Sequence, residues 1–441
     1  MMQNRWVFII PVVVFLGLLV TSKYLIEPDT KKIEIDSRTS QPIELTFWRN
    51  RGNDAENRAY EELVSSFEKE NQDIKINMKM IPYSDYEVRL RTEMATGTPP
   101  DIMAIDSPNL ALYANAGSLL SIDSYMKKEG DLADFPASTM KGLTYKGQIY
   151  LAPIAESSIA LFYNKHVLKK AGVPFPSSDP NKPLSWNQVV KIAKLVTNHE
   201  KGITGIDPGQ GFGDGEAPAY FKIPLLWQFG ADVVDQNSTT ASGYLDSEKA
   251  IMALQFYQDL YHKHQVASVE IAPDAFVKGK LGMTILGSWS LKGFEKISNF
   301  TLDNDFGVAP LPKGVSQVAP NGGWALGISS KTKYPDESWR FIKYVTSYEG
   351  IKTYVTITGD LPARYSVVKD IPELKQYPLN IFIEQMLNHS KNRPVTPAYP
   401  IVSNTIRTLF EDIGIGGKDV RSSAKVAAEK INTGLQEFQK P

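Results

Sequence analysis

The sequence predicts an α/β protein made of two domains. The chain has 441 residues, more than a single hydrophobic core usually supports, so two domains are expected. Its first ordered segment shows the pattern strand, helix, strand, helix, strand, which produces a mainly parallel sheet with helices on its faces. Hydrophobic residues make up 42% and charged residues 22% of the chain. This composition is ordinary for a folded globular protein and argues against long disordered stretches.

The pattern of the first domain begins at Ile43. Leu45 and Phe47 indicate a strand, residues 74–80 alternate strictly between apolar and polar, and residues 101–106 predict a third strand. The helices between these strands carry apolar residues at helical spacing, which are Tyr60, Leu63, Val64 and Phe67 in the first and Leu90 and Met94 in the second. The second helix is expected to end where residues 97–100 read Gly-Thr-Pro-Pro.

Strands and helices alternate through the rest of the chain. We expect strands at residues 148–153, 159–163, 281–286, 306–309 and 324–328. Ser185 and Gln188 form a capping box at a helix start, a further helix spans 246–261, and Pro335 opens a helix with acidic residues in its first turn. The predicted core residues of the helices are Trp186, Val189, Val190, Ala193, Val196, Tyr244, Phe256, Tyr257, Tyr261, Val420, Ala424, Ala427, Ile431, Leu435 and Phe438.

Charge and cysteine content exclude several classes of function. The 48 basic and 49 acidic residues give a net charge of −1, so no global field attracts the chain to nucleic acid. The sequence has no cysteine, which excludes thiol catalysis, thiolate metal sites, disulfides and a lipid attached through a cysteine. His262 and His264 have the wrong spacing for one helix face. We therefore expect no metal site and no cofactor.

The N-terminal segment predicts export. Arg5 precedes an apolar run from Trp6 to Val20, and a cationic start followed by an apolar core is typical of a secretory signal. No small-x-small cleavage site follows, and with snorkelling at Lys23 the segment barely reaches the length that spans a bilayer. We expect residues 1–26 to be a membrane anchor, with a cleaved signal as the alternative, and residues 27–42 to be a linker. The rest of the chain is then extracytoplasmic and tethered to the outer face of the membrane.

Four stretches carry a family resemblance. They are residues 99–106 (Pro-Pro-Asp-Ile-Met-Ala-Ile-Asp) with 113–120, residues 145–153 leading to 160–165, residues 276–289, and residues 306–312 with 321–324. In this order and spacing they resemble the carbohydrate-binding proteins of ATP-binding-cassette importers, the maltose-binding-protein-like family of extracellular solute-binding proteins. The resemblance runs from Ile43 to the C-terminus.

The resemblance implies a two-lobed, periplasmic-binding-protein-like α/β fold whose lobes are discontinuous in sequence and joined by a hinge. Chain crossings are expected near residues 153–157, 313–320 and 359–362, where Pro and Gly residues lie. Lobe 1 would then hold residues 43–155 and 318–358, and lobe 2 would hold residues 156–317 and 359–441. The implied function is capture of a mono- or oligosaccharide between the lobes and its delivery to the membrane permease subunits of the importer. We expect a monomer that is not an enzyme and has no nucleic-acid partner.

Sugar recognition needs aromatic rings for the apolar faces of the sugar and polar groups for its hydroxyls. Open α/β sheets present such groups beyond the carboxyl ends of their strands. Trp48 and Arg49 are expected right after the first strand, and Asp106 and Asn109 after the third. A core tryptophan and a helix cap are the alternative interpretations of Trp48 and Asp106.

Further candidates come from the resemblance. The family commonly has a ligand-contacting acid at the first crossing, and Glu156 with Ser157 lies there, one position earlier than in the family. The family places an aromatic ring on the sugar at Trp289, which follows a predicted strand. The remaining candidates are Gly323 and Trp324, Arg364, Tyr399 and Trp227, with an exposed arginine and a core tryptophan as alternatives for Arg364 and Trp227. Ser403 stands where the family has an aromatic residue, which indicates a differently shaped pocket.

Two other functions remain open at the level of sequence. A membrane-anchored sugar sensor would present its closed form to a receptor kinase. A glycoside hydrolase would use a pair of carboxylates, for which Asp106 and Glu156 are the candidates. Placement of Glu156 at a hinge argues against the hydrolase.

Overall fold

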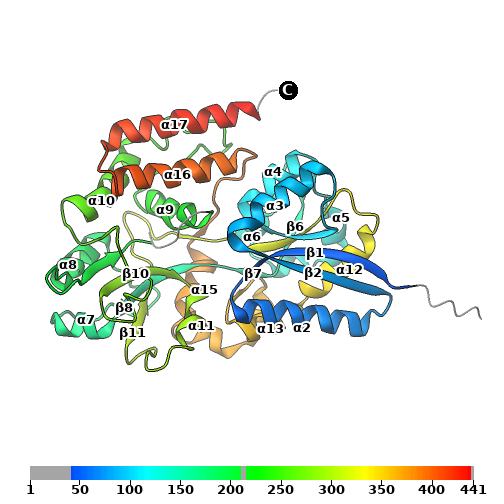
Figure 1. Ribbon diagram of the computed structural model, residues 1–441, viewed down its shortest axis with the longest axis horizontal. Helices are drawn as coiled ribbons and strands as arrows, with labels where there is room; N and C mark the ends of the chain where they lie inside the picture. The colour runs from blue at the N-terminus through cyan, green and yellow to red at the C-terminus, as the bar shows by residue number, and fades with distance from the viewer. Residues whose placement is uncertain (1–40, 210–214, 439–441) are drawn as a thin grey trace, which may run out of the picture. The chain divides into compact units, whose positions relative to one another are not determined.

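The computed structural model describes residues 41–209 and 215–438, and it builds two lobes on two separate sheets (Figure 1). The predicted anchor, residues 1–26, and nearly all of the linker lie outside the described residues. Within the described part of the chain, no helix combines the length and the apolar character needed to cross a membrane.

The first lobe contains a five-stranded sheet in the order β2-β1-β3-β13-β6. Its strands are β1 (Ile43–Arg51), β2 (Ile74–Pro82), β3 (Ile102–Asp106), β6 (Leu151–Pro153) and β13 (Trp324–Ile328). β1 is parallel to β2 and β3, and β13 is antiparallel to β3 and β6. The predicted parallel β-α-β-α-β start is confirmed, and a strand from far along the chain completes the sheet.

Helices cover both faces of this sheet. Figure 1 shows α2 (Asp54–Glu70) and α13 (Tyr348–Thr358) on one face and α3 (Tyr83–Thr96) and α4 (Leu110–Asn115) on the other. Alternation along β3 explains this, because Ile102 and Ala104 join the core beneath α2 while Met103 and Ile105 join the core beneath α3. The smaller elements of this lobe and of its border are η1 (Ser107–Asn109), α5 (Asp123–Glu129), η2 (Leu132–Asp134), α6 (Ala137–Gly142), β4 (Thr144–Tyr145), β5 (Gln148–Ile149), α12 (Pro335–Val345), α14 (Tyr365–Asp370), η3 (Pro372–Lys375) and α15 (Leu379–Asn388).

The second lobe contains a four-stranded sheet in the order β11-β8-β10-β9. β8 (Ile159–Asn164) is antiparallel to β10 (Leu281–Gly287) and β11 (Phe306–Ala309), and β9 (Thr204–Asp207) is parallel to β10. Its helices are α7 (Lys165–Lys170), α8 (Trp186–Val196), α9 (Ala217–Gln228), α10 (Glu248–His262), α11 (Ser290–Phe294), α16 (Tyr399–Gly414) and α17 (Val420–Glu437). α16 packs against α9, α10 and α17.

The chain passes between the sheets through very short strands. β7 (Ala155–Glu156) lies between β6 and β8 in sequence and pairs with β14 (Leu361–Pro362), and β12 (Ala319–Pro320) lies between β11 and β13 and pairs with β15 (Ser390–Lys391). β7, β12 and β14 fall within the three segments where crossings are expected from the sequence, and β15 falls outside them. The boundaries of the lobes stay a prediction.

Local signals predicted several helices well. The Ser185 hydroxyl accepts from the Gln188 backbone N–H, and the Gln188 side chain accepts from the Ser185 backbone N–H, so the capping box is confirmed. The predicted face of α8 is buried. Two core assignments are wrong, because Tyr244 precedes α10 and Phe438 follows α17, and both side chains are exposed. α10 begins at Glu248 rather than residue 246, because the Ser247 side chain caps it.

The capping box generates a stability prediction. Ser185→Ala removes the acceptor for the Gln188 backbone N–H, so we expect the free energy of unfolding in urea to fall by about 1 kcal/mol. Ser178→Ala, an exposed serine in the loop before α8, is the matched control and should change it by less than about 0.5 kcal/mol. Equal stability of the two variants would contradict the role given to the cap.

Candidate ligand-binding site

A cavity of about 410 Å³ lies between the lobes. Its walls come from the carboxyl end of β1 and the turn into α2, the ends of β3 and α13, the crossing strand β7, the starts of α9 and α11, and the loop before α16. The lining residues are Asn50, Arg51, Gly52, Asn53, Glu56, Tyr83, Asp106, Ile154, Ala155, Glu156, Ser157, Glu216, Ala217, Tyr220, Phe221, Trp289, Gly322, Gly323, Trp324, Tyr354, Asp360 and Arg393. The position follows the rule that open α/β sheets bind ligands beyond the carboxyl ends of their strands.

Each lobe contributes an aromatic cluster to the cavity. In the first lobe, Tyr83 meets Trp324 edge-on with 6.3 Å between ring centroids. In the second, Trp289 lies 6.0 Å from Tyr220 and 6.3 Å from Phe221. Trp289 and Trp324 are only partly buried, so each ring keeps surface that a ligand can cover.

One buried guanidinium joins carboxylates from the two lobes. Arg393 donates to Asp106 at the end of β3 at 3.0 Å and to Glu216 at the start of α9 at 2.6 Å. Its guanidinium also lies 5.0 Å above the Tyr220 ring. Burial opposes the charge of Arg393, but the negative charges around it outweigh burial and raise the pKa of the guanidinium. The three side chains therefore form an ion-pair bridge across the cavity wall.

Glu216 is held by hydroxyl donors as well as by Arg393. Tyr399 donates its phenol to one carboxylate oxygen, and Ser403 donates to the other at 2.5 Å. Burial raises the pKa of Glu216, while Arg393 and both hydroxyls favour the charged form. At the position where the resemblance implies an aromatic ring, Ser403 thus supports a carboxylate.

Glu156 and Ser157 sit where the chain first crosses between the lobes. The buried Glu156 carboxylate accepts from the Thr139 hydroxyl and from the Gly322 backbone N–H at 3.0 Å, and burial raises its pKa. Ser157 donates to the Gly322 carbonyl and lies 2.8 Å from the Tyr220 hydroxyl. Gly322 has φ +105°, and a Cβ on Gly323 would approach the Ala155 carbonyl oxygen to 2.8 Å. Glycine at both positions therefore lets the two crossing segments touch.

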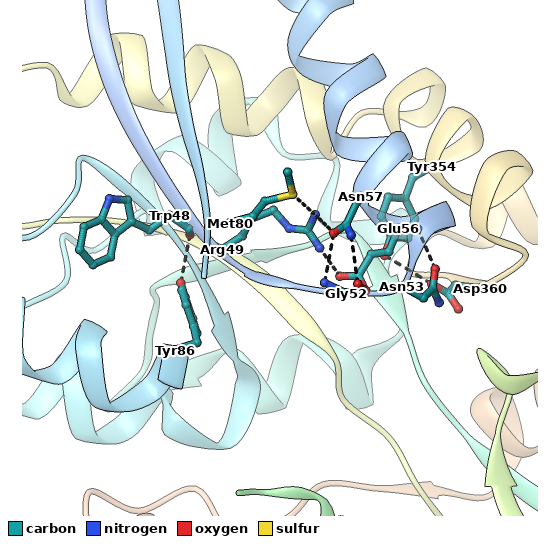
Figure 2. A network of polar contacts seen from close by, with 10 residues as sticks. All are labelled: Trp48, Arg49, Gly52, Asn53, Glu56, Asn57, Met80, Tyr86, Tyr354 and Asp360. Atoms are coloured by element: carbon teal, nitrogen blue, oxygen red, sulfur yellow. Dashed lines mark hydrogen bonds and ion pairs between the residues drawn. The ribbon is translucent and has the colours of Figure 1, made fainter. Parts of the chain in front are cut away.

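A second pair of carboxylates lines the cavity between α2 and the turn after α13 (Figure 2). Glu56 accepts from the buried Arg49 guanidinium at 2.6 Å, and Asp360 accepts from the Tyr354 phenol at 3.3 Å. Arg49 also lies 4.1 Å above the Tyr60 ring. Burial, and then the charge of Glu56, raises the pKa of Asp360 to about 7.

The predicted site residues divide into two groups. Those in the lining are Asp106, Glu156, Ser157, Trp289, Gly323 and Trp324. Those outside it are Trp48, Arg49, Asn109, Trp227, Arg364 and Tyr399. The binding roles of the lining residues stay predictions.

Trp48 and Arg49 lie inside β1, not after it, because β1 stays paired with β2 as far as Arg51. Figure 2 shows their side chains leaving the strand in opposite directions. Arg49 turns under α2 to Glu56, while Trp48 stacks beneath the Lys79 ammonium at 4.3 Å. Period-2 alternation explains the opposite directions, and the cavity wall is formed by the last residues of the strand, Asn50 and Arg51, instead.

The other residues outside the lining have structural partners. Arg364 is buried, not exposed as its alternative interpretation held, and donates to the Thr346 carbonyl at 2.8 Å and to Asp134 at 3.1 Å. Trp227 is a buried core residue that donates its indole N–H to Asp232 at 2.9 Å. Asn109 is buried in the turn before α4. Tyr399 stands behind Glu216 and supports it.

Sequence reasoning missed several lining residues, chiefly Glu216, Tyr220, Asp360 and Arg393. Asp360 lies within a predicted crossing, so a signal was available for it. Tyr220 lies on α9, which is buried all round and so has no polar face that marks a site. Among the described residues, no group of three or more His, Asp or Glu side chains is arranged to hold a metal ion.

Comparison with known proteins adds independent information. The family model described as bacterial extracellular solute-binding protein matches residues 52–352, more than two thirds of the chain. A maltotriose-binding protein of Pyrococcus abyssi is 26% identical over 376 residues, covering 82% of this chain and 76% of that protein.

Solved structures give the same fold. The GacH receptor of Streptomyces glaucescens, solved unliganded and with acarbose, has a TM-score of 0.78 at 25% identity and covers 90% of this chain and 100% of that one. A solute-binding protein of an ABC transporter from Thermotoga lettingae, bound with α-D-tagatose, has a TM-score of 0.78 at 24% identity and covers 89% of this chain and 100% of that one. The two-lobed α/β fold expected from the sequence is confirmed.

The ion-pair bridge generates a stability prediction. Arg393→Met leaves Asp106 and Glu216 in the wall without their cation, so we expect the free energy of unfolding at pH 7 to fall by about 3 kcal/mol. The triple variant Asp106→Asn, Glu216→Gln, Arg393→Met removes the uncompensated charges and should regain part of the loss. Urea unfolding measures both, and a single variant as stable as the wild type would contradict the bridge.

The raised pKa of Asp360 generates a pH prediction. Because its pKa is about 7 in the folded state against 3.8 as its ordinary value, the folded state holds the proton more tightly. The resulting stabilisation is lost as the pH rises through 7. Relative to Asp360→Asn, the wild type should therefore lose about 2 to 3 kcal/mol of unfolding free energy between pH 5 and pH 8. Parallel pH profiles of the two proteins would refute the assignment.

Proposed function

The chain belongs to the bacterial extracellular solute-binding proteins, and from this premise we propose that it captures a carbohydrate between its lobes and delivers it to the permease of an ATP-binding-cassette importer. The observation that carries the proposal is the composition of the cavity wall, in which aromatic clusters from both lobes alternate with carboxylates. Rings cover the apolar faces of sugars, and carboxylates are strong acceptors for hydroxyl groups. The name of the maltotriose-binding relative supports the same class of ligand.

The mechanism we propose is a population shift between open and closed forms. Trp324 belongs to one lobe and Trp289 to the other, so a ligand that covers both rings stabilises the closed form. The short crossing strands β7, β12 and β14 give the hinge few residues in which to concentrate its motion. The closed form is the one that docks on the permease.

We propose that binding proceeds without catalysis. A hydrolase would need one carboxylic acid to protonate the leaving group and one free carboxylate to attack or to activate water. Asp106 is paired with Arg393, and Glu156 accepts from Thr139 and Gly322. Both candidate carboxylates are thus occupied by the protein, which supports a binding role.

The proposed location follows from the family and from the N-terminal sequence. The protein works outside the cytoplasm as a monomer, and residues 1–26 tether it to the outer face of the membrane. The polar linker that ends at residue 42 gives the lobes reach toward the permease.

A thermal-shift screen of the full chain in mild detergent, against mono- and oligosaccharides, peptides and polyols, tests the proposal. A ligand at 100 times its dissociation constant should add about 2.7 kcal/mol to the stability. Trp289→Ala should abolish the shift while the variant without ligand still melts cooperatively. The matched control is Tyr244→Ala, an exposed aromatic residue outside the lining, which should leave the ligand-induced shift unchanged. Stabilisation by peptides alone, or release of reducing sugar from a bound saccharide, would contradict the proposal.

A further inference from the structure

The cavity wall carries more acidic than basic side chains. The acidic ones are Glu56, Asp106, Glu156, Glu216 and Asp360, and the basic ones are Arg51 and Arg393. The terminal nitrogens of Arg393 pair with Asp106 and Glu216, while its Nε has no hydrogen-bond partner, and Arg51 is exposed to solvent. Among the described residues, neither Glu156 nor Asp360 has an ion-pair partner. A ligand that brings only hydroxyl groups would leave this negative charge uncompensated in a closed cleft.

The imbalance is greatest where Glu56, Tyr354 and Asp360 meet, the Glu56–Asp360 end (Figure 2). Arg49 pairs with Oε1 of Glu56, and no ion pair to Asp360 is present in residues 41–209 and 215–438. The second oxygen of Glu56 accepts no hydrogen bond from a described residue. Burial, and then the negative charge of Glu56, raises the pKa of Asp360 to about 7, because both disfavour the ionised carboxylate.

An independent observation also indicates a missing donor. Asn50 is 3% exposed and lines the cavity, and its side-chain oxygen has no hydrogen-bond partner. A buried acceptor without a donor costs about 1 to 3 kcal/mol, so a ligand that supplies donors recovers this energy. An ammonium group supplies three donors and no acceptor. The amide oxygen of Asn50 and the carboxylate of Asp360 are both acceptors, so an ammonium group is suited to donate to either.

Building on the proposed function, we propose that the ligand is a carbohydrate with a protonated amine, and that the ammonium binds between Glu56 and Asp360 beside the Tyr354 ring. Two carboxylates give charge-assisted hydrogen bonds, and the tyrosine adds a cation–π contact. The neighbouring Tyr60, whose ring meets Tyr354 edge-on at 5.5 Å, already holds Arg49 in this way. The rest of the sugar then extends toward Trp289 and Trp324.

Calorimetry on the full chain in mild detergent tests this with oligosaccharides of equal length: glucosamine oligomers, their N-acetylated forms, and glucose oligomers. Acetylation removes the charge and keeps the ring, so the amine form should bind at least tenfold tighter than the acetylated form. This preference should shrink as salt is raised. Equal affinities for the amine and acetylated forms would overturn the inference.

Asp360→Asn is the diagnostic variant, because it keeps the shape and the Tyr354 hydrogen bond while removing the charge. It should weaken binding of the amine oligomer at least tenfold and should reduce the preference for the amine form over the acetylated form. Glu87→Gln is the matched control, since burial also raises the pKa of Glu87 to about 7 but Glu87 lies outside the lining. An unchanged amine affinity in Asp360→Asn would overturn the ammonium site.

The outcomes separate the two proposals. Tight binding of a neutral saccharide with no gain from the amine leaves the proposed function standing and overturns this inference. Absence of binding by every saccharide, charged or neutral, overturns the proposed function and the inference with it.

Discussion

The buried guanidinium of Arg393 is the contact on which the geometry of the cleft depends. It receives one carboxylate from the end of β3 in the first lobe and one from the start of α9 in the second, and the loop before α16 positions it between them. A charge taken out of water is tolerated only when it is paired and hydrogen-bonded. Because each carboxylate belongs to a different lobe, this requirement ties the relative position of the lobes to the position of one side chain. Tyr399 and Ser403 hold Glu216 from behind, so the helix that carries them takes part in the same arrangement.

Close backbone contact at the crossings complements this bridge. Gly322 and Gly323 let the turn before β13 lie against β7, where Glu156 and Ser157 bond to the Gly322 backbone. The result is a wall made of main chain next to a wall made of charged side chains. The Gly322 N–H and carbonyl are already bonded to the crossing segment, so a ligand meets chiefly the rings and polar side chains of the lining. The chemistry of the cleft is therefore determined by the lining side chains that do not bond to the crossing segments.

Prediction from the sequence succeeded where the signal is local and failed where it depends on the tertiary fold. Capping at Ser185, the alternation of residues 74–80 and the position of Trp289 after β10 depend on neighbours in the chain, and all three features are present. The family resemblance supplied the order of the lobes, which no local pattern contains. In the sequence, Arg49 and Arg364 stand at positions that suit a ligand-binding arginine. In the structure, Arg49 pairs with Glu56 and Arg364 pairs with Asp134. Arg393 could not be predicted, because its partners come from residues more than 170 positions away.

The contrast among these arginines shows how the same residue type builds a scaffold or a site. Arg49 and Arg364 lie within the first lobe and its border, where their guanidinium groups lie over Tyr60 and Phe135. Arg49 pairs with Glu56, which lines the cavity, and Arg364 pairs with Asp134, which does not. Arg393 lies over Tyr220 in the same manner, but its ring and its acids line the cavity. The protein thus repeats one unit, a guanidinium between a ring and carboxylates, with the cation supplied by the chain. At Glu56, Tyr354 and Asp360 a ring and a second carboxylate are present, and this is where we propose that the ammonium group of the ligand supplies the additional cation.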